Sequence, residues 1–192
     1  MQATKNLSLL KELTDNYLME LVQGGDFSKM GVLYERYHRR VFAYFFRCTS
    51  DQSKSEDLVH NVFMRLLKYR DSFRGEGQFV HWLFTVVRNT WFDLSKKKDV
   101  LKHADELDSM RETATQASDE DGEDYKNDRI QLMRRAMEKL SSEKREAIIM
   151  SRYEGLKYTE IASICECSVS AIKTRVQRGL IDLKRIMQEL ES

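Results

Sequence analysis

The sequence predicts an all-α fold of two small helical domains joined by a flexible acidic linker, with a helix-turn-helix in the C-terminal domain. Three observations support this prediction. Proline is absent and only 8 of the 192 residues are glycine, which disfavours turn-rich sheets. Apolar residues recur every three or four positions through most of the chain, and no alternating run indicates a strand. One acidic segment separates the two helical regions.

The first helical region is expected to hold three amphipathic helices, with apolar stripes over residues 30–48, 58–67 and 79–87. Ser53 followed by Glu56 predicts a capping box at the start of the second helix. The glycine-containing segment between the second and third stripes must be a loop. Trp82 lies on the third stripe, and we expect a core role for it over the alternative of stacking on a base.

The formal net charge of +1 conceals a separation of sign along the chain. Residues 96–128 carry 6 basic against 11 acidic side chains, whereas residues 129–192 carry 13 basic against 9 acidic ones. Residues 105–124 contain almost no large apolar side chains, so this segment cannot bury itself. We therefore expect a flexible linker over residues 99–128, acting either as a solvated spacer or as a regulatory segment.

Residues 159–180 are typical of a helix-turn-helix: a short helix, a tight turn and a longer helix. Ala162 suits a close helix crossing, and Ser168 can cap the second helix. Between residues 168 and 185 there are five basic side chains and one acidic one, which favours DNA binding over a merely solvated face. The residues expected to contact base edges and phosphates are Ser170, Lys173, Thr174, Gln177 and Arg178.

The sequence carries no signature of covalent catalysis. Gly75 and Gly77 lack the third glycine of a dinucleotide fingerprint, and there is no P-loop or metalloprotease helix. The four histidines show no ligand spacing, and Cys165 and Cys167 are expected to be small apolar residues, not metal ligands. We predict no catalytic residue, metal, cofactor or small-molecule substrate. Three scattered cysteines and the lack of a long apolar segment predict a cytoplasmic protein without direct membrane insertion.

Two segments resemble bacterial RNA polymerase sigma factors of the sigma-70 family, specifically the short extracytoplasmic function (ECF) group. The first includes SEDLVHNVFMRLLKYRDSFRGEGQF and is similar to region 2, which docks on core polymerase and melts the promoter. The second includes KYTEIASICECSVSAIKTRVQRGL and is similar to region 4, which binds the upstream (−35) element. The resemblance implies four parts: an N-terminal extension (1–23), region 2 (24–98), a linker (99–128) and region 4 (129–192).

The resemblance also implies roles for individual residues of the first domain. The residues implied to lie on or support the surface for core RNA polymerase are Asp57, Leu58, Phe63, Arg65 and Leu66. Those implied in promoter melting and recognition of the downstream (−10) element are Phe73, Arg74, Arg88, Asn89, Lys96 and Lys97. Promoter DNA and an anti-sigma factor are the further partners implied. Glu166 stands where the family favours a turn glycine, which costs about 1 kcal/mol if the left-handed backbone is kept.

Two other classes of protein remain as alternatives. A stand-alone helix-turn-helix regulator would bind a near-palindromic operator without polymerase. A helical adaptor with an incidental basic face would bind neither DNA nor polymerase at moderate salt.

Overall fold

The structure is a computed structural model that describes residues 13–75, 78–105 and 124–191, with residues 95–105 and 124–127 described for the backbone only. Its elements are α2 (Asp15–Gln23), α3 (Ser28–Thr49), α4 (Gln52–Lys68), the 3₁₀ turn η1 (Arg70–Ser72), α5 (Phe79–Asp105), α6 (Asp124–Glu138), α7 (Ser142–Ile148), the π-helical turn η2 (Ile149–Tyr153), α8 (Tyr158–Ile164) and α9 (Val169–Glu191). No strand occurs within the described residues, and the predicted all-α class is confirmed. None of the described helices is long and apolar enough to cross a bilayer.

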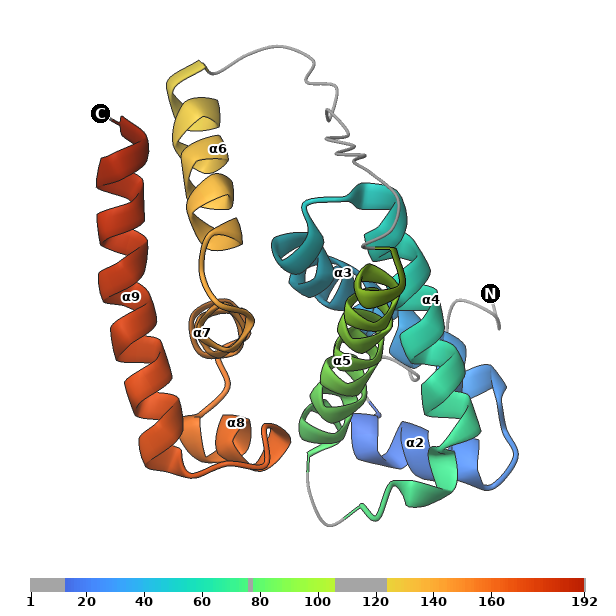
Figure 1. Cartoon of the computed structure of the whole chain (residues 1–192). Coiled ribbons are helices and arrows are strands. Elements are labelled where there is room, and N and C mark those ends of the chain that lie inside the picture. Colours follow the sequence, from blue (N-terminus) through green and yellow to red (C-terminus); the bar gives the residue numbers. More distant parts are fainter. Residues whose placement is uncertain (1–12, 76–77, 106–123, 192) are drawn as a thin grey trace. The chain divides into compact units, whose positions relative to one another are not determined.

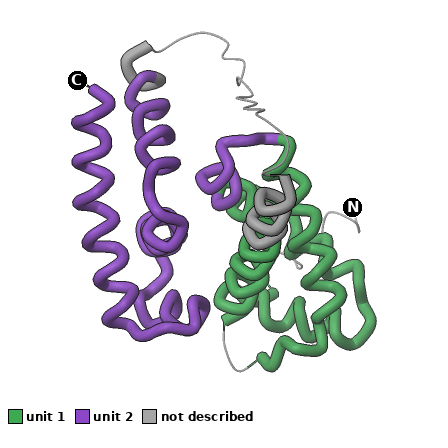
Figure 2. The backbone as a smooth tube through the Cα atoms, viewed as in Figure 1, with its two compact units in different colours: residues 1–43, 53–94 green, residues 44–52, 95–192 purple. Residues whose placement is uncertain are grey.

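The chain divides into two compact units, shown in two colours in Figure 2. The first comprises residues 1–43 and 53–94, as far as these are described, and the second comprises residues 44–52 and 95–192 with the same restriction. Residues 44–52, which include the end of α3, therefore belong to the second unit, although the residues on both sides of them belong to the first. A division of the sequence into consecutive domains does not predict this.

Aromatic side chains hold the helices of the first unit together. Tyr34 on α3 meets Phe63 on α4 edge to face, with ring centroids 4.8 Å apart. Tyr37 on α3 packs against Phe79 on α5, with centroids 5.4 Å apart. Tyr37, Phe63 and Phe79 lie on the predicted apolar stripes, whereas Tyr34 lies outside its stripe and is 39% exposed. Such aromatic pairs add about 0.5–1.5 kcal/mol each to the free energy gained from buried area.

Two boundaries differ from the predicted ones. Helix α4 begins at Gln52, so Ser53 lies inside its first turn and the predicted capping box is wrong. Helix α5 continues to Asp105 and α6 begins at Asp124, so both ends of the predicted linker are helical. No glycine or proline interrupts residues 95–105, and nothing there stops a helix from continuing. The acidic segment 106–123 lies outside the described residues.

In the second unit, α9 packs against α6, α7 and α8 (Figure 1). Ile148, Ile161 and Ile172, one on each of α7, α8 and α9, are at most 2% exposed. The Oγ atom of Ser168 accepts a hydrogen bond of 3.1 Å from the backbone N–H of Ala171. This bond confirms that Ser168 caps α9.

The apolar spacing predicts that Val169, Ile172, Val176, Leu180 and Leu183 form the buried stripe of α9, but Val169 is only partly buried and the stripe also differs at position 180. Leu180 is 36% exposed, and the neighbouring Gly179 is buried in its place. A Cβ atom on Gly179 would lie 2.9 Å from Cδ1 of Ile148 and 3.2 Å from Cβ of Lys144. Helices α7 and α9 therefore cross closely at a position where any side chain larger than hydrogen would force neighbouring atoms to shift. A glycine within an amphipathic helix was the sequence signal for a close helix crossing here, but the predicted apolar stripe did not include Gly179.

We expect Gly179→Val to destabilise the protein by about 1–3 kcal/mol, the usual cost of forcing atoms into a filled core. Intrinsic helix propensity slightly favours valine over glycine, so a loss can come only from packing. Thermal unfolding followed by circular dichroism measures the effect. The matched control is Ile181→Val on the same helix, since Ile181 is 62% exposed. Equal unfolding midpoints for both variants would contradict the close crossing.

Candidate nucleic-acid and polymerase interfaces

The backbone of the turn between α8 and α9 sets the direction in which α9 starts. The N–H of Cys167 donates to the carbonyl of Ala162 at 3.0 Å, and the N–H of Glu166 donates to the carbonyl of Ser163 at 3.3 Å. Glu166 has a φ of 52°, in the left-handed region. This is a Schellman motif, which usually takes glycine at the left-handed position. The chain keeps the turn despite a glutamate, at the cost of about 1 kcal/mol expected from its sequence.

The predicted DNA-contacting side chains share one exposed face in the first three turns of α9. Ser170 exchanges a hydrogen bond with Ser168 at 2.9 Å, and Thr174 Oγ1 donates to the carbonyl of Ser170 at 2.9 Å. Among the described residues, Lys173, Gln177 and Arg178 have no hydrogen-bond or ion-pair partner. The remaining hydrogen-bonding capacity of this face therefore points to solvent. Such a face suits the major groove, which a recognition helix reads with its N-terminal part.

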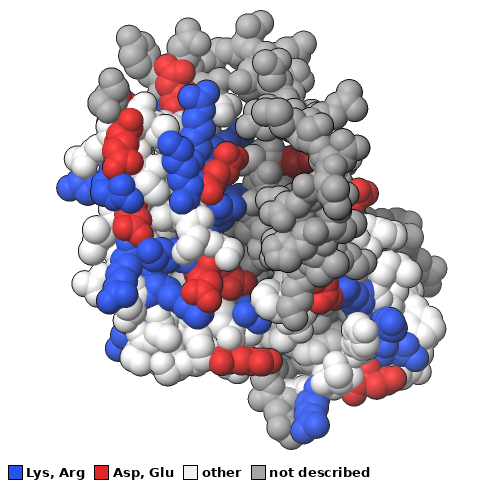
Figure 3. All heavy atoms as spheres, in the orientation of Figure 1, with Lys and Arg blue, Asp and Glu red and all other residues white. Residues whose placement is uncertain are grey.

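Ion pairs hold α9 against α7. Lys144 donates to Asp182 at 2.6 Å, and this hydrogen bond holds the pKa of the Asp182 carboxyl below its usual range. Arg175 pairs with Glu143 at 3.3 Å and also donates to the sulfur of Cys167 at 3.6 Å. On the face of the molecule shown in Figure 3, basic and acidic side chains alternate over α6 and α9. Arg175 is thus engaged within its own unit, whereas Lys173 and Arg178 extend toward solvent.

The three cysteines have different surroundings. Cys48 is buried, and burial raises the pKa of its thiol to about 12, so this thiol is neutral at physiological pH. Cys165 is buried as predicted, with its sulfur 3.8 Å from Oε2 of Glu146, whereas Cys167 is partly exposed. Among the described residues, no group of three or more His, Cys, Asp or Glu side chains could hold a metal ion.

The residues expected at the downstream element are only partly brought together. Phe73 is 5% exposed, and its ring packs against Phe79 and Trp82, with centroids 6.2 and 5.4 Å away. The aromatic core of the unit therefore holds the ring of Phe73, and the role in promoter melting that the resemblance implies for this residue stays a prediction. Arg74 is exposed.

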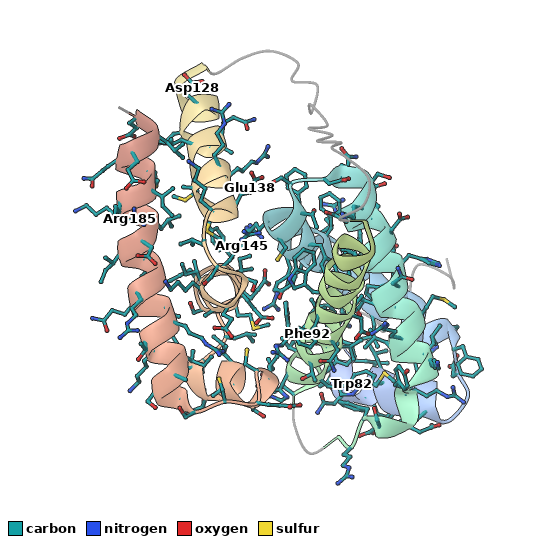
Figure 4. All side chains as sticks on the ribbon, in the orientation of Figure 1. Trp82, Phe92, Asp128, Glu138, Arg145 and Arg185 are labelled. Atoms are coloured by element: carbon teal, nitrogen blue, oxygen red, sulfur yellow. The ribbon has the colours of Figure 1, made fainter. Side chains whose placement is uncertain are left out.

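Asn89 is exposed on α5, and Arg88 lies over the ring of Phe92 with its Cζ atom 5.7 Å from the centroid. Figure 4 shows Phe92 further along α5 than Trp82. The backbone of Lys96 and Lys97 continues α5, but their side chains lie outside the described residues.

A groove of about 410 Å³ lies between the end of α4 and the first half of α5. Tyr69, Trp82 and Asn89 line it, together with the ion pair of 2.7 Å between Arg65 and Asp93. The indole Nε1–H of Trp82 donates to Ser72 Oγ at 3.3 Å. Trp82 thus has the predicted core contacts on one side and an open edge on the other. Tyr69 was not among the predicted site residues, because it lies outside every apolar stripe; its side chain is 48% exposed.

The residues expected at the polymerase surface also divide by exposure. Asp57 is exposed, whereas Leu58, Phe63 and Leu66 are 4%, 6% and 0% exposed. These three support α4 from inside, and they present no surface of their own. The exposed residues of α4 include Asp57, His60, Asn61, Met64 and Lys68. Their spacing of three and four residues places them along one outward face.

The geometry defines an all-α protein whose first unit carries an aromatic groove and whose second unit holds a helix-turn-helix. The family Sigma-70 region 2 matches residues 33–100, and the family Sigma-70, region 4 matches residues 130–183. The chain belongs to the sigma-70 family of RNA polymerase sigma factors, as its resemblance to the ECF group implied.

Curated relatives and solved structures agree with this membership. The chain is 29% identical to RNA polymerase sigma factor YlaC of Bacillus subtilis over 157 residues, which are 81% of this chain and 90% of YlaC. It is 27% identical over 176 residues to the ECF RNA polymerase sigma-E factor of Escherichia coli, covering 88% and 92% of the two chains.

Among solved structures, the fold is similar to that of the sigma factor RpoE of Bartonella quintana, which was crystallised with the anti-sigma factor NepR. That comparison has a TM-score of 0.68 and 26% identity, covering 82% of this chain and 96% of the other.

Proposed function

We propose that the protein is an ECF-type sigma factor that binds core RNA polymerase and directs promoter recognition, DNA melting and transcription initiation. The observation that carries this proposal is the presence of both sigma-70 regions, in order, in one chain. Residues 24–98 act as region 2 and residues 129–192 as region 4, with residues 1–23 as an extension and 99–128 as the linker. Each of the two regions binds the promoter weakly alone. Because both are attached to one polymerase, binding of the first raises the effective concentration of the second at its promoter element.

Helix α9 reads the upstream (−35) element. Lys173, Gln177 and Arg178 offer donors that no other described residue engages, on the exposed face of a capped helix. Arginine and lysine suit guanine edges and phosphates, and glutamine suits adenine. Ser170 and Thr174 lie on the same face and complete the contact surface.

The groove between α4 and α5 receives an unpaired base of the downstream (−10) element. Tyr69 and Trp82 provide aromatic walls, and the amide of Asn89 can both donate to and accept from a base edge. Stacking on an aromatic side chain contributes about 1–3 kcal/mol per base, which offsets part of the cost of unpairing. Arg74, Arg88, Lys96 and Lys97 act on the DNA backbone, whereas Phe73 supports the groove from the core.

The exposed face of α4 binds core polymerase, with Asp57 as its acidic contact and Leu58, Phe63 and Leu66 holding the helix in place. The protein works in the cytoplasm, performs no covalent chemistry and needs no cofactor or small-molecule substrate. Because RpoE of Bartonella quintana is seen bound to an anti-sigma factor, we extend control by such a partner to this chain.

In vitro transcription with added core polymerase on a pool of genomic fragments tests this function. We expect new start sites that share a two-part, non-palindromic promoter and appear only when the protein is present. If initiation is unchanged, or if the protein alone binds a near-palindromic operator tightly, the sigma assignment fails in favour of a stand-alone regulator.

A further inference from the structure

Helix α2 lies against the segment that leads from η1 to the start of α5. Three polar residues, Asn16, Glu20 and Gln23, follow one another at spacings of four and three, so they share one face of the helix. Leu18, Met19 and Val22 on the same helix are 0% exposed and anchor it in the core of the first unit. A polar face on such a rigid element can hold neighbouring backbone in place.

Gln23 holds the first half of this segment. Its side-chain amide nitrogen Nε2 donates to the carbonyl of Arg70 at 2.9 Å and to the carbonyl of Phe73 at 2.7 Å. An amide NH₂ group has two donors, and both are used here. One side chain thereby sets the distance between two carbonyls of the segment.

Asn16 holds the second half. Its Oδ1 atom accepts from the backbone N–H of Phe79 at 2.8 Å, and its Nδ2 atom lies 3.4 Å from the carbonyl of Gly75. Phe79 is the first residue of α5, so its N–H has no partner within the helix. Gln78, which precedes it, is not a usual capping residue. Asn16 therefore caps α5 from a position 63 residues away in the sequence.

Glycine at position 75 fits this arrangement. Gly75 has a φ of 69°, which favours glycine, and a Cβ atom there would lie 3.4 Å from Oε1 of Glu20 on α2. Arg74 is exposed, and both of its neighbours in the sequence are held by α2. The carbonyl of Phe73 contacts Gln23, and the carbonyl of Gly75 contacts Asn16. The direction in which Arg74 points thus depends on α2.

We propose that Gln23 and Asn16 are positioning residues for downstream-element recognition: from α2, their side-chain amides fix the backbone of residues 70–75 and the start of α5, and so determine base preference. This inference rests on the proposed function, because it assumes that this segment and the adjoining groove meet promoter DNA. Neither residue contacts the base itself. Each acts by holding Arg74 and the groove-lining Ser72 and Trp82 in register.

The test compares three variants of the full-length protein. Gln23→Glu keeps the shape of the side chain but sets an acceptor-only carboxylate against two carbonyls, whereas Gln23→Lys keeps donors for both. Asp15→Asn is the matched control on the same helix. It removes the ion pair of 2.5 Å between Asp15 and Arg36, and Asp15 also accepts a hydrogen bond from Tyr37, so both contacts tie α2 to α3. The substitution leaves the side chains of Asn16 and Gln23, which bond to residues 70–79, unchanged.

Each protein is assayed with core polymerase on a promoter library randomised at the downstream element, and start-site yields give the base preference at every position. We expect Gln23→Glu to reduce discrimination between the best and next-best base by about fivefold or more, because both hydrogen bonds of Gln23 are lost and one such bond corresponds to about that factor. Gln23→Lys should retain the wild-type preference. Asp15→Asn should lower the unfolding temperature without altering the preference.

Hydrogen exchange of the free proteins provides a second readout, independent of polymerase. Amides of residues 72–75 and 79 should exchange faster in Gln23→Glu than in the wild type or Asp15→Asn. If the wild type initiates selectively and Gln23→Glu has the same base preference, the inference is wrong and the proposed function stands. If the wild type directs no selective initiation, both fall. Unchanged exchange in Gln23→Glu would also overturn the inference, since the segment would then keep its place without the amide.

Discussion

Replacing Asp57 with lysine and Met64 with aspartate is expected to weaken binding to core RNA polymerase by about tenfold or more while leaving the fold intact. Both side chains lie on the exposed face of α4, and Met64 is 53% exposed. A surface that docks on a partner relies on a few central residues, and an apolar side chain replaced by a charged one no longer contributes. Reversing the charge of Asp57 adds repulsion against a basic partner surface.

Affinity is measured by competition with a labelled wild-type protein for core polymerase, without DNA. The control is Glu35→Gln, an exposed position on α3 with the same net change of charge. Unfolding free energies of all three proteins should agree within about 0.5 kcal/mol, because exposed substitutions rarely cost more. If the double variant folds and binds core polymerase as tightly as the wild type does, α4 is not part of the surface that binds polymerase.

Leu66 is a poor choice for this experiment, although the resemblance to sigma factors names it with Asp57. Its side chain is 0% exposed, and cutting it back to alanine would cost about 2–5 kcal/mol of stability. Loss of binding by such a variant would report on folding. Met64 is therefore the better residue to replace, because its side chain is exposed on the same face of α4 as Asp57. It was not predicted from the sequence, since an exposed methionine does not change the apolar spacing of a helix.

Replacing both Lys173 and Arg178 with alanine is expected to lower transcription from promoters that depend on the upstream element by about thirtyfold or more. Each interaction with a base edge or phosphate contributes about 1–3 kcal/mol. Neither side chain has a partner within the described residues, so its removal breaks no internal bond there. The fold and polymerase binding should be unaffected.

The experiment measures initiation at promoters with intact and with scrambled upstream elements, over a range of salt concentrations. The salt dependence should become shallower by about one unit for each phosphate that the variant no longer neutralises. The control pair is Lys184→Ala with Arg185→Ala, two exposed residues further along α9, where Arg185 pairs with Glu189 at 2.6 Å. Equal effects of both pairs, or failure to bind polymerase, would argue against a recognition face at the start of α9.

Much of the second unit could be predicted because its signals are local. The cap at Ser168, the spacing of Ile172 and Val176, and the exposed basic positions all follow from residues within a few turns of one helix. The left-handed turn at Glu166 was recognised by comparison with a family pattern. Its backbone adopts the expected φ although the side chain disfavours it.

The downstream site was less predictable, because its parts meet only in three dimensions. Phe73 was implied in promoter melting, and the sequence did not show that its ring packs in the core against Phe79 and Trp82. Tyr69 lines the groove, but it lies outside the apolar stripes, so the sequence did not predict that its ring would form one of the groove's walls. An aromatic residue in a loop has no periodicity, and its direction is set by whichever elements pack beside it.

By itself, the sequence determined the helical class, the helix-turn-helix and the exposed face of α9, since helix periodicity and capping act within a few residues. Only the tertiary structure decided that Gly179 seats α9 against α7 and that Asn16 caps α5. Those contacts join residues 31 to 63 positions apart, and no local pattern encodes which side chain a distant backbone will meet. Close packing then selects the residue by the space and the hydrogen-bond partner available.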